Sequence, residues 1–311
     1  MNTNPDRFGR VAVLMGGWAN EREVSLRSGN AVLSALQAAG VDAHPVDLQP
    51  GNLLPQLTSF DRAFNCVHGR GGEDGQLPGA LQLLGLPCTG SGVLGAALAM
   101  DKYRTKLIWR GRGLPTPDWM LLNTEEDLTQ AMTQLGVPLM VKAALEGSSI
   151  GVSQVQNAAQ LATAWRDAQA CDSHVIAEQC VCGTEYTTSI LGNQALPLIR
   201  LETDRAFYDH TAKYQTGHTH YQIPCGLDAD LEQQIQALCL EAFRALDCHG
   251  WGRVDVMLDQ AQQPWLIEVN TVPGMTELSL VPKAAAAIGL DFTALVLEIL
   301  AQTLDQPDDN A

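Results

Sequence analysis

The sequence predicts a mixed α/β protein, in which a doubly wound α/β region precedes two α+β regions. Strands alternate with helices over residues 1–99, strands joined by a short glycine loop follow over residues 100–182, and strands dominate residues 183–311. At 311 residues, the chain is long enough for two or three domains with a well-buried core. We therefore expect three domains with these boundaries.

Composition limits the expected partners. The formal net charge is −16 and the sequence pI is about 4.7, whereas binding to nucleic-acid phosphates requires clustered Lys and Arg. The first residues, "MNTNPDRFGR", do not resemble a signal peptide, and no apolar run reaches the ~20 residues that span a bilayer. We expect a cytoplasmic protein with neither nucleic-acid nor membrane partners. Its eight cysteines form no CxxC pair and are expected to be reduced, structural thiols.

The first third has the pattern of a doubly wound parallel sheet. "RVAVLMGG" is an apolar strand ending in Gly-Gly, and residues 21–40 have apolar positions at helical spacing before a final glycine. "VDAHPVDL" and "DRAFNCVHG" are typical strands, and "GQLPGALQLLG" is typical of a helix. This order predicts βαβ units with helices covering the sheet.

The middle third is predicted as a small α+β domain. A helix over "DKYRTKLIWRGRG" precedes a proline-marked linker that runs into a strand, "LPTPDWMLL". Thr124 and Asp127 match a capping box at the start of the next helix. The strands "PLMVKAAL" and "GVSQVQ", a helix and the strand "SHVIAEQCV" complete the domain.

The last third contains more strands. "TEYTTSILG" and "QALPLIRLE" are predicted strands, followed by a polar loop from Thr203 to Gln222 and a helix from Asp228 to Cys248. "GWGRVDVMLD" and "WLIEVN" are separated by the turn-like "DQAQQP", which predicts an antiparallel hairpin. Two terminal helices follow.

The hairpin carries polar residues on apolar strands. Glu268 and Asn270 lie two residues apart, so they share a face at roughly 6.6 Å spacing. Arg253 and Asp255 share a face of the other strand. Because buried carboxylates are costly without partners, two interpretations arise: an Arg–Asp salt bridge with Glu268 at the sheet edge, or an oxygen-only site for Mg²⁺ and phosphates. These residues alone leave both open.

Two glycine-containing segments could bind phosphates. Gly90–Gly95 matches a dinucleotide fingerprint, but it lacks the strong preceding strand and the acidic residue about 20 positions later, so a tight turn entering a helix explains it. The loop Glu146–Gly151 offers backbone N–H groups and two hydroxyls to an anion, or is an ordinary hairpin turn. Lys142 on the preceding apolar strand needs a partner, which favours the anion site.

Isolated acids and one histidine are further candidates. Glu178 and Glu185 could accept hydrogen bonds from an adenine amino group and a ribose, or be solvated charges at strand ends. Glu21 stands at a helix start, where the helix dipole already favours an acid. His68 follows a strand of the first sheet, where α/β folds bind ligands, although a single histidine is more often structural.

Taken together and in order, these segments resemble the D-alanine:D-alanine ligase family of ATP-grasp enzymes. The similarity extends from Val11 to Pro282. It is carried by the segments "GGWANEREVSLRSG", "HGRGGEDG", "TGSGV", "MDK", "VK", "EGSSIGV", "AKY", "GWGRVDVMLD" and "EVNTVPGMTELSLVP".

The resemblance implies the ATP-grasp fold, with an N-terminal substrate domain and two α+β domains that hold ATP between them. It implies that the phosphates are bound by Lys102, Lys142, Ser148 and Ser149. Glu178 and Val181 would bind the adenine, and Glu185 the ribose. Two Mg²⁺ (or Mn²⁺) ions would be bound by Asp255, Glu268 and Asn270.

It also implies a reaction. ATP phosphorylates the carboxylate of one D-alanine, and the amine of a second D-alanine attacks the acyl phosphate to give the dipeptide used in cell-wall precursors. Arg253 and the Gly274 N–H would stabilise the oxyanion. The substrates would be held by Glu21 and His68, and by Lys213, Ser279 and Leu280. Glu21, Ser148 and Tyr214 would form a hydrogen-bonded triad, with residues 207–217 covering the site.

Several alternatives remain at this stage. A related ligase would use D-lactate or D-serine as its second substrate, but Tyr214 favours the amine-using dipeptide ligase. An inactive nucleotide-binding module is disfavoured by intact metal-site residues, and an NAD-dependent dehydrogenase rests on Gly90–Gly95 alone. A homodimer is implied by the resemblance only. Trp18, Gln179 and His210 depart from the family pattern at positions close to the substrates.

Overall fold

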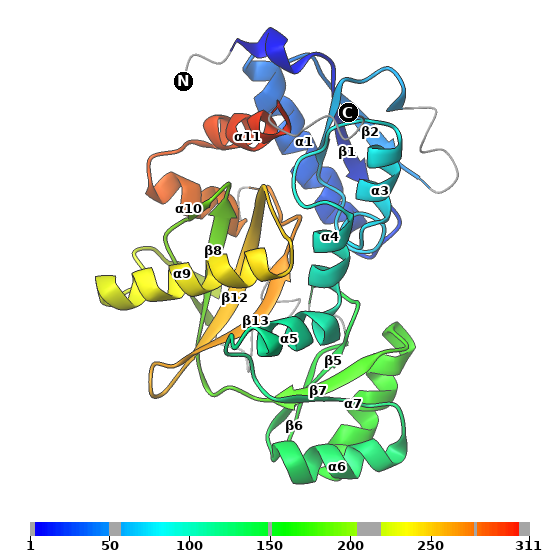
Figure 1. The fold of residues 1–311 in the computed structure, drawn as a ribbon, viewed down its shortest axis with the longest axis vertical. Coiled ribbons are helices and arrows are strands. Elements are labelled where there is room, and N and C mark those ends of the chain that lie inside the picture. Colours follow the sequence, from blue (N-terminus) through cyan, green and yellow to red (C-terminus); the bar gives the residue numbers. More distant parts are fainter. Residues whose placement is uncertain (1–3, 50–56, 149–150, 204–218, 277–278, 305–311) are drawn as a thin grey trace.

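The computed structural model describes residues 4–49, 57–148, 151–203, 219–276 and 279–304. Three β-sheets follow one another along the long axis of the molecule, each with its own helices (Figure 1). This is the mixed α/β architecture that the sequence predicts. The domain boundaries at residues 99 and 182 stay a prediction.

The first sheet is parallel, with strand order β2-β1-β3. All six residues of β1 are buried, because helices and neighbouring strands enclose this apolar central strand. The elements of this region are η1 (Pro5–Phe8), β1 (Val11–Gly16), α1 (Arg22–Ala38), β2 (Ala43–Leu48), β3 (Arg62–Asn65), α3 (Gln76–Leu83) and α4 (Val93–Met100). The predicted order of strands and helices is confirmed.

The second sheet is antiparallel, with order β4-β7-β5-β6. Helix α6 begins with the predicted capping box, since Thr124 accepts from the Asp127 N–H and Asp127 accepts from the Thr124 N–H. The elements are α5 (Lys102–Gly111), β4 (Trp119–Leu121), α6 (Glu125–Leu135), β5 (Leu139–Ala143), β6 (Ser153–Val155), α7 (Ala158–Cys171) and β7 (Val175–Gln179).

The third sheet is antiparallel with order β11-β10-β8-β12-β13, and β9 pairs with β8. One prediction is wrong here: Thr219–Gln222, expected within a polar loop, forms the edge strand β11. Pairing with β10 supplies the backbone hydrogen bonds, so this polar segment needs no apolar alternation. The elements are β8 (Gly183–Leu191), β9 (Gln194–Ala195), β10 (Ile199–Thr203), β11 (Thr219–Gln222), α9 (Ala229–Ala245), β12 (Trp251–Asp259) and β13 (Pro264–Asn270).

The last helices return to the first region. Helices α10 (Leu280–Ala287) and α11 (Phe292–Ala301), followed by η2 (Gln302–Leu304), lie at the same end of the molecule as α1 (Figure 1). Leu295 and Ile299 of α11 are fully buried in one core cluster with Val32 and Leu36 of α1. The two ends of the chain therefore share a hydrophobic core.

The glycines of the dinucleotide-like segment serve packing and a turn. Gly90 adopts a positive φ of 93°, which only glycine tolerates well. A Cβ atom at Gly95 would overlap the Asp247 carbonyl oxygen, so this glycine lets α4 approach the loop after α9. The prediction of a tight turn entering a helix is confirmed.

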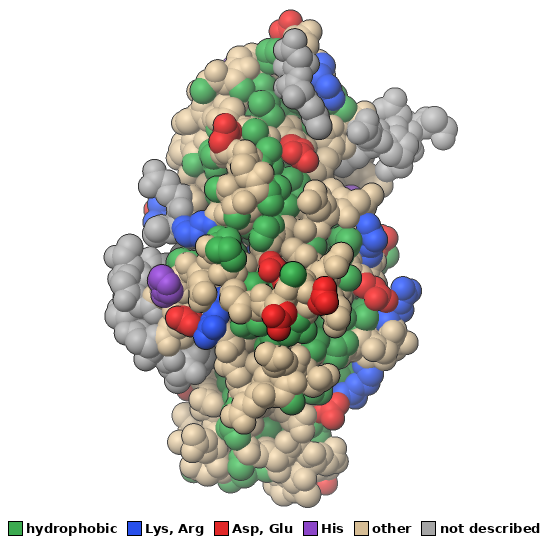
Figure 2. Space-filling view, turned by 90° about the vertical axis from the view of Figure 1, so that its left-hand side faces the viewer, with side chains coloured by type: hydrophobic (Ala, Val, Ile, Leu, Met, Phe, Trp, Pro, Cys, Tyr) green, Lys and Arg blue, Asp and Glu red, His purple; other side chains and the backbone are tan. Residues whose placement is uncertain are grey.

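The state of the cysteines and the charges on the surface agree with what the composition predicts. All eight cysteines are free thiols. On the face in Figure 2, acidic side chains lie around the middle of the molecule, and the Lys and Arg side chains are scattered. Within the described ranges, no single helix has the length and apolarity to cross a membrane; only the bent pair Leu280–Ala287 with Phe292–Leu304 meets those two criteria jointly.

Candidate active site

Two cavities meet between the three sheets. The small cavity has a volume of about 120 Å³ and lies where the first and third sheets face each other. The large cavity has a volume of about 450 Å³ and lies between the second and third sheets, within the usual size range of a ligand pocket. Lys102 and Glu268 line both cavities. A ligand in one cavity therefore lies next to a ligand in the other.

The predicted site residues divide between these two cavities, except for Asp255, which lines neither of them. The small cavity is lined by Glu21, His68, Ser148, Arg253, Asn270, Gly274, Ser279 and Leu280. The large cavity is lined by Lys142, Glu178, Val181 and Glu185. Ser149, Lys213, Tyr214 and His210 lie outside the described residues. Of the unusual residues, Gln179 lines the large cavity, and Trp18 is half-exposed with its ring beside Gly71.

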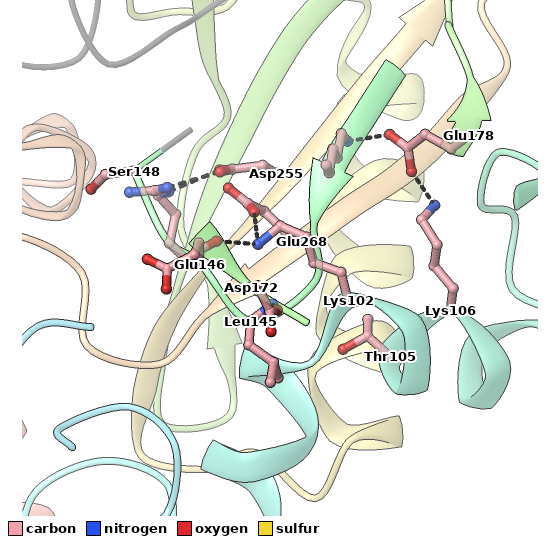
Figure 3. A network of polar contacts seen from close by, with 12 residues as sticks. Lys102, Thr105, Lys106, Leu145, Glu146, Ser148, Asp172, Glu178, Asp255 and Glu268 are labelled. Atoms are coloured by element: carbon pink, nitrogen blue, oxygen red, sulfur yellow. Dashed lines mark hydrogen bonds and ion pairs between the residues drawn. The ribbon is translucent and has the colours of Figure 1, made fainter. Parts of the chain in front are cut away.

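Lys102 is held at the junction of the cavities. It is the first residue of α5, whose N-cap Asp101 accepts a hydrogen bond from the Arg104 N–H. The Lys102 ammonium donates to the Glu146 carbonyl oxygen at 2.8 Å and lies 3.3 Å from Glu268 Oε2 (Figure 3). The cation thus connects the start of the Glu146–Gly151 loop with β13.

The β12–β13 hairpin brings its polar residues together as predicted. Arg253 pairs with Asn270, and Asp255 pairs with Glu268, before a register shift after Asp255. Arg253 donates to both Asp255 oxygens at 2.8 Å, and Thr187 donates to Asp255 Oδ1 at 2.6 Å. The Arg–Asp salt bridge, one of the two interpretations from sequence, is therefore present.

The chemistry of the donor set also fits a hard divalent cation. Asp255 and Glu268 stand opposite each other on adjacent strands, and Asn270 adds an amide oxygen two residues from Glu268. Mg²⁺ prefers oxygen ligands of these kinds and also binds substrate phosphates. Within the described residues, no set of three or more His, Cys, Asp or Glu side chains is arranged for a metal. Two carboxylates and an amide would leave coordination positions for phosphate oxygens.

Glu21 and Ser148 form a direct contact across the small cavity. The Ser148 hydroxyl donates to Glu21 Oε1 at 2.7 Å, which joins the start of α1 to the loop after β5. Glu21 is 7% exposed. A Cβ atom at Gly69 would overlap Glu21 Oε2, and Gly69 has a φ of 70°, so glycine is required there for two reasons.

The segment from Val272 to Met275 is fixed to the first region by three side chains. His68 Nδ1 donates to the Val272 carbonyl oxygen at 2.7 Å, and Glu73 Oε1 accepts from the Val272 N–H at 3.3 Å. Ser28 Oγ accepts from the Met275 N–H at 3.0 Å and lies 3.3 Å from His68 Nε2. Gly274, between the two anchored residues, is positioned by these bonds.

The pKa values of His68 and Glu73, two buried side chains that contact this segment, are shifted. Burial lowers the pKa of His68 from 6.5 to about 4, despite the opposing hydrogen bond to Val272, so the imidazole is neutral at pH 7. Its Nδ1–H donates to Val272, which leaves Nε2 to accept from Ser28. Burial, together with the nearby Glu21 carboxylate, raises the pKa of Glu73 from 4.5 to about 8.

Gly274 and Ser279 form another part of the wall of the small cavity. The Gly274 N–H donates to no group among the described residues, and a Cβ at this position would lie 2.8 Å from Ser279 Oγ. Ser279 is the N-cap residue of α10 without a side-chain bond to the helix, and its hydroxyl accepts from the Thr276 N–H at 2.9 Å. This wall offers a backbone donor and a hydroxyl to a small ligand.

Lys142 and Glu178 line the large cavity and form a buried ion cluster with Lys106 behind them. Lys142 pairs with Glu178 Oε1, and the Lys106 nitrogen lies 2.9 Å from Glu178 Oε2 (Figure 3). Burial alone would raise the pKa of Glu178, but Lys106 and then Lys142 outweigh it and lower that pKa. The sequence predicted that Lys142 needs a partner, and in the structure Glu178 is that partner.

Sequence reasoning missed Lys106, Glu73 and Ser28. Lys106 lies four residues after Lys102 on one helix, so the i, i+4 spacing indicated a shared face. Glu73 lies in the quoted segment "HGRGGEDG" but received no role. Ser28 gave no signal, because its partner Met275 is distant in sequence and uses only its backbone N–H.

A parallel-sheet region beside two α+β regions, with a lysine-lined cavity between the latter, defines the ATP-grasp class. Comparisons with known proteins agree. The family profile described as D-ala D-ala ligase C-terminus matches residues 108–301. A D-alanine–D-alanine ligase from Methylococcus capsulatus is 56% identical over 295 residues, covering 94% of this chain and 96% of the relative. The chain therefore belongs to the D-alanine–D-alanine ligase family.

Solved structures extend the comparison to the fold. A D-alanine–D-alanine ligase from Bacillus anthracis matches with a TM-score of 0.87 and 36% identity, covering 95% of this chain and 97% of that one. The same ligase complexed with ATP matches with a TM-score of 0.85 and 33% identity, with the same coverage. The VanG D-Ala:D-Ser ligase from Enterococcus faecalis matches with a TM-score of 0.85 and 27% identity, covering 94% and 99%. The predicted fold class and family are confirmed.

Proposed function

We propose that this chain joins two D-alanine molecules, with ATP as the energy source, to form D-alanyl-D-alanine for peptidoglycan precursors. The products besides the dipeptide are ADP and phosphate. The observation that carries the proposal is the pair of adjoining cavities that share Lys102 and Glu268. A nucleotide in the large cavity would present its terminal phosphate to a small carboxylate substrate in the other.

The large cavity and the residues at its border with the small cavity provide the groups that a nucleotide requires. Lys102 and Lys142 would bind the phosphates, with Ser148 and Ser149 in the loop that follows β5. Glu178 and Val181 would contact the adenine, and Glu185 the ribose. Mg²⁺ or Mn²⁺ would be held by Asp255, Glu268 and Asn270, and its charge would offset the negative charge of the phosphates.

The small cavity would hold both amino acids. Glu21 is buried and accepts from Ser148, so its carboxylate is oriented to bind the ammonium of the first D-alanine, with His68 beside it. Ser279, Leu280 and Lys213 would hold the second D-alanine. Tyr214 would complete the triad with Glu21 and Ser148.

The tetrahedral intermediate needs donors that are already in place. Arg253 and Gly274 both line the small cavity. Gly274 is fixed between Val272 and Met275, both of which hydrogen-bond to side chains of the first region. A donor held in this way stabilises a developing oxyanion without a reorganisation cost.

The second substrate is the point at which relatives differ. The VanG D-Ala:D-Ser ligase shares this fold, but at 27% identity, whereas the D-alanine–D-alanine ligase of Methylococcus capsulatus reaches 56%. The higher identity over almost the whole chain favours D-alanine in both positions. A cytoplasmic location, expected from the sequence, and a homodimer, implied by the resemblance, both stay predictions.

The test is phosphate release from ATP and Mg²⁺ with D-alanine. Parallel reactions contain L-alanine, D-alanine with D-lactate, D-alanine with D-serine, or no amino acid. We expect release that requires D-alanine only, with the dipeptide identified by mass spectrometry. Release that requires D-lactate or D-serine would replace the second substrate, and no release under any condition would overturn the proposed activity.

A further inference from the structure

Lys106 is a buried cation to which the proposed reaction assigns no task. The side chain is 1% exposed, and its nitrogen donates to Thr116 Oγ1 at 2.6 Å and lies 3.4 Å from the Pro117 carbonyl oxygen. Thr116 in turn donates to the Leu266 carbonyl oxygen of β13 at 2.9 Å. The lysine is thus held where the second and third sheets meet.

The ammonium of Lys106 faces a carboxylate of the large cavity. It lies 2.9 Å from Glu178 Oε2, while the other oxygen, Oε1, pairs with Lys142. The Oε2 atom is itself buried, in contact with the Lys106 ammonium. Glu178 also lines the large cavity, so its carboxylate presents negative charge to a ligand bound there.

Two cations beside one buried carboxylate determine its charge. A buried carboxylate otherwise tends to take up a proton, and a protonated Glu178 could donate a hydrogen bond as well as accept one. Lys142 alone would also have to serve the bound phosphates, which leaves Lys106 as the cation committed to Glu178. Burial lowers the pKa of Lys106 to about 8, with Glu178 opposing the shift, so the ammonium is charged at pH 7.

We propose that Lys106 is a positioning residue for base selection, which holds Glu178 ionised on the wall of the large cavity. This inference rests on the proposed function, because it assumes that a purine nucleotide occupies that cavity. An ionised carboxylate attracts the 6-amino group of adenine and repels the 6-oxo group of hypoxanthine or guanine. Removal of the cation weakens this discrimination.

The test compares ATP with inosine triphosphate, which replaces the 6-amino group by an oxo group and leaves the ribose and phosphates unchanged. The variants are K106M, which removes the charge, and K106Q, which keeps a donor without the charge. R110M is the matched control, because Arg110 lies four residues further along α5 and pairs with the exposed Asp118. Thermal unfolding of each variant reports on the fold.

We expect K106M and K106Q to raise the KM for ATP about tenfold and to lower the ATP-to-ITP ratio of kcat/KM by a similar factor, the scale of one hydrogen bond to a charged group. The kcat with saturating ATP should stay within about twofold of the wild type, since Lys106 is remote from the reacting carboxylate. R110M should keep the wild-type ratio. A residue with a structural role only would not change base preference.

An unchanged ATP-to-ITP ratio in a folded K106M or K106Q protein would overturn the inference, as would an equal loss of kcat with both nucleotides. Calorimetry measures the Kd values for ATP and ITP without relying on turnover, so it tests the role of Lys106 separately from the proposed function. If the wild type binds ATP but makes no dipeptide, the proposed function fails, and the Kd ratios of the variants still decide the role of Lys106.

Discussion

The two cavities are held together by different forces. In the small cavity, the wall around Gly274 is fixed by hydrogen bonds between side chains of the first region and the backbone of Val272 and Met275. In the large cavity, Glu178 is fixed by ion pairs with Lys106 and Lys142. One site is organised by backbone geometry, the other by buried charge.

This difference predicts different sensitivities. Backbone geometry tolerates little added volume, because interiors are close-packed and a donor must point at the reacting atom. A buried ion pair is less sensitive to a change of shape than to the loss of one charge. The loss of one charge leaves its partner buried and unpaired. Substitutions can therefore test the two cavities separately.

Glu268→Gln should have the largest effect, because this residue serves both cavities. We expect kcat to fall roughly a thousandfold, since the neutral amide neither holds Mg²⁺ nor pairs with Lys102 as the carboxylate does. Asn270→Ala should act in the same direction. Phosphate release at saturating Mg²⁺ measures the loss, and circular dichroism checks the fold. Glu298→Gln on an exposed face of α11 is the control; near-normal turnover in E268Q would count against the metal assignment.

His68 should make the small cavity sensitive to acid. Its pKa in the folded protein is about 4, against 6.5 when exposed. Between these values the unfolded chain binds a proton that the folded chain does not, so the free energy of unfolding decreases as the pH falls from 6.5 to 4. The gap corresponds to about 3 kcal/mol.

Denaturant unfolding at pH 7 and pH 4.5 measures this effect. His68→Gln should be less stable than the wild type at pH 7, and it should lose less stability on acidification. His44→Gln, at an exposed histidine beside Asp42, is the matched control. Equal acid sensitivity in the wild type and the His68 variant would contradict a buried neutral imidazole.

Gly69→Ala tests the geometric side of the comparison. The new methyl group would overlap Glu21 Oε2 and require a left-handed backbone at alanine, with an expected loss of about 1–2 kcal/mol of stability. The KM for D-alanine should rise about tenfold, because Glu21 moves, while the KM for ATP stays near its wild-type value. Gly111→Ala is the control, since a Cβ there meets nothing within 4 Å. A rise in the KM for ATP alone would reverse our assignment of the cavities.

Thr124→Ala should have the smallest effect and leave both cavities unchanged. It removes the capping box of α6, at about 1 kcal/mol of stability. Thermal unfolding should record that loss while both KM values remain constant. A change in either KM would mean that the second region transmits strain to the site.

The sequence predicts the local elements well and the long-range pairs less well. The alternation in "WLIEVN" places Glu268 and Asn270 on one face, and the hairpin register then brings Asp255 opposite Glu268. Strand β11 escaped prediction because an edge strand needs no buried face. Lys106, a partner of Glu178, lies 72 positions earlier in the sequence. No local sequence pattern relates two charges that are so far apart.

The resemblance supplied residue roles that periodicity could not. Glu21 and Ser148 are 127 residues apart, yet they make the contact that the family pattern implies. Physical reasoning on either residue alone favoured a helix cap and a turn. The additional anchors, Glu73 and Ser28, act on backbone atoms, and the identity of the backbone partner leaves no trace in the sequence.

The shared core of α1 and α11 affects how the chain matures during synthesis. Leu295, Val296, Ile299 and Leu300 pack with residues near the N-terminus, so the first region lacks part of its hydrophobic core until the last helix has left the ribosome. The Gly274 wall likewise depends on anchors made hundreds of residues earlier. A nascent chain therefore exposes an apolar face of α1 until α11 emerges from the ribosome.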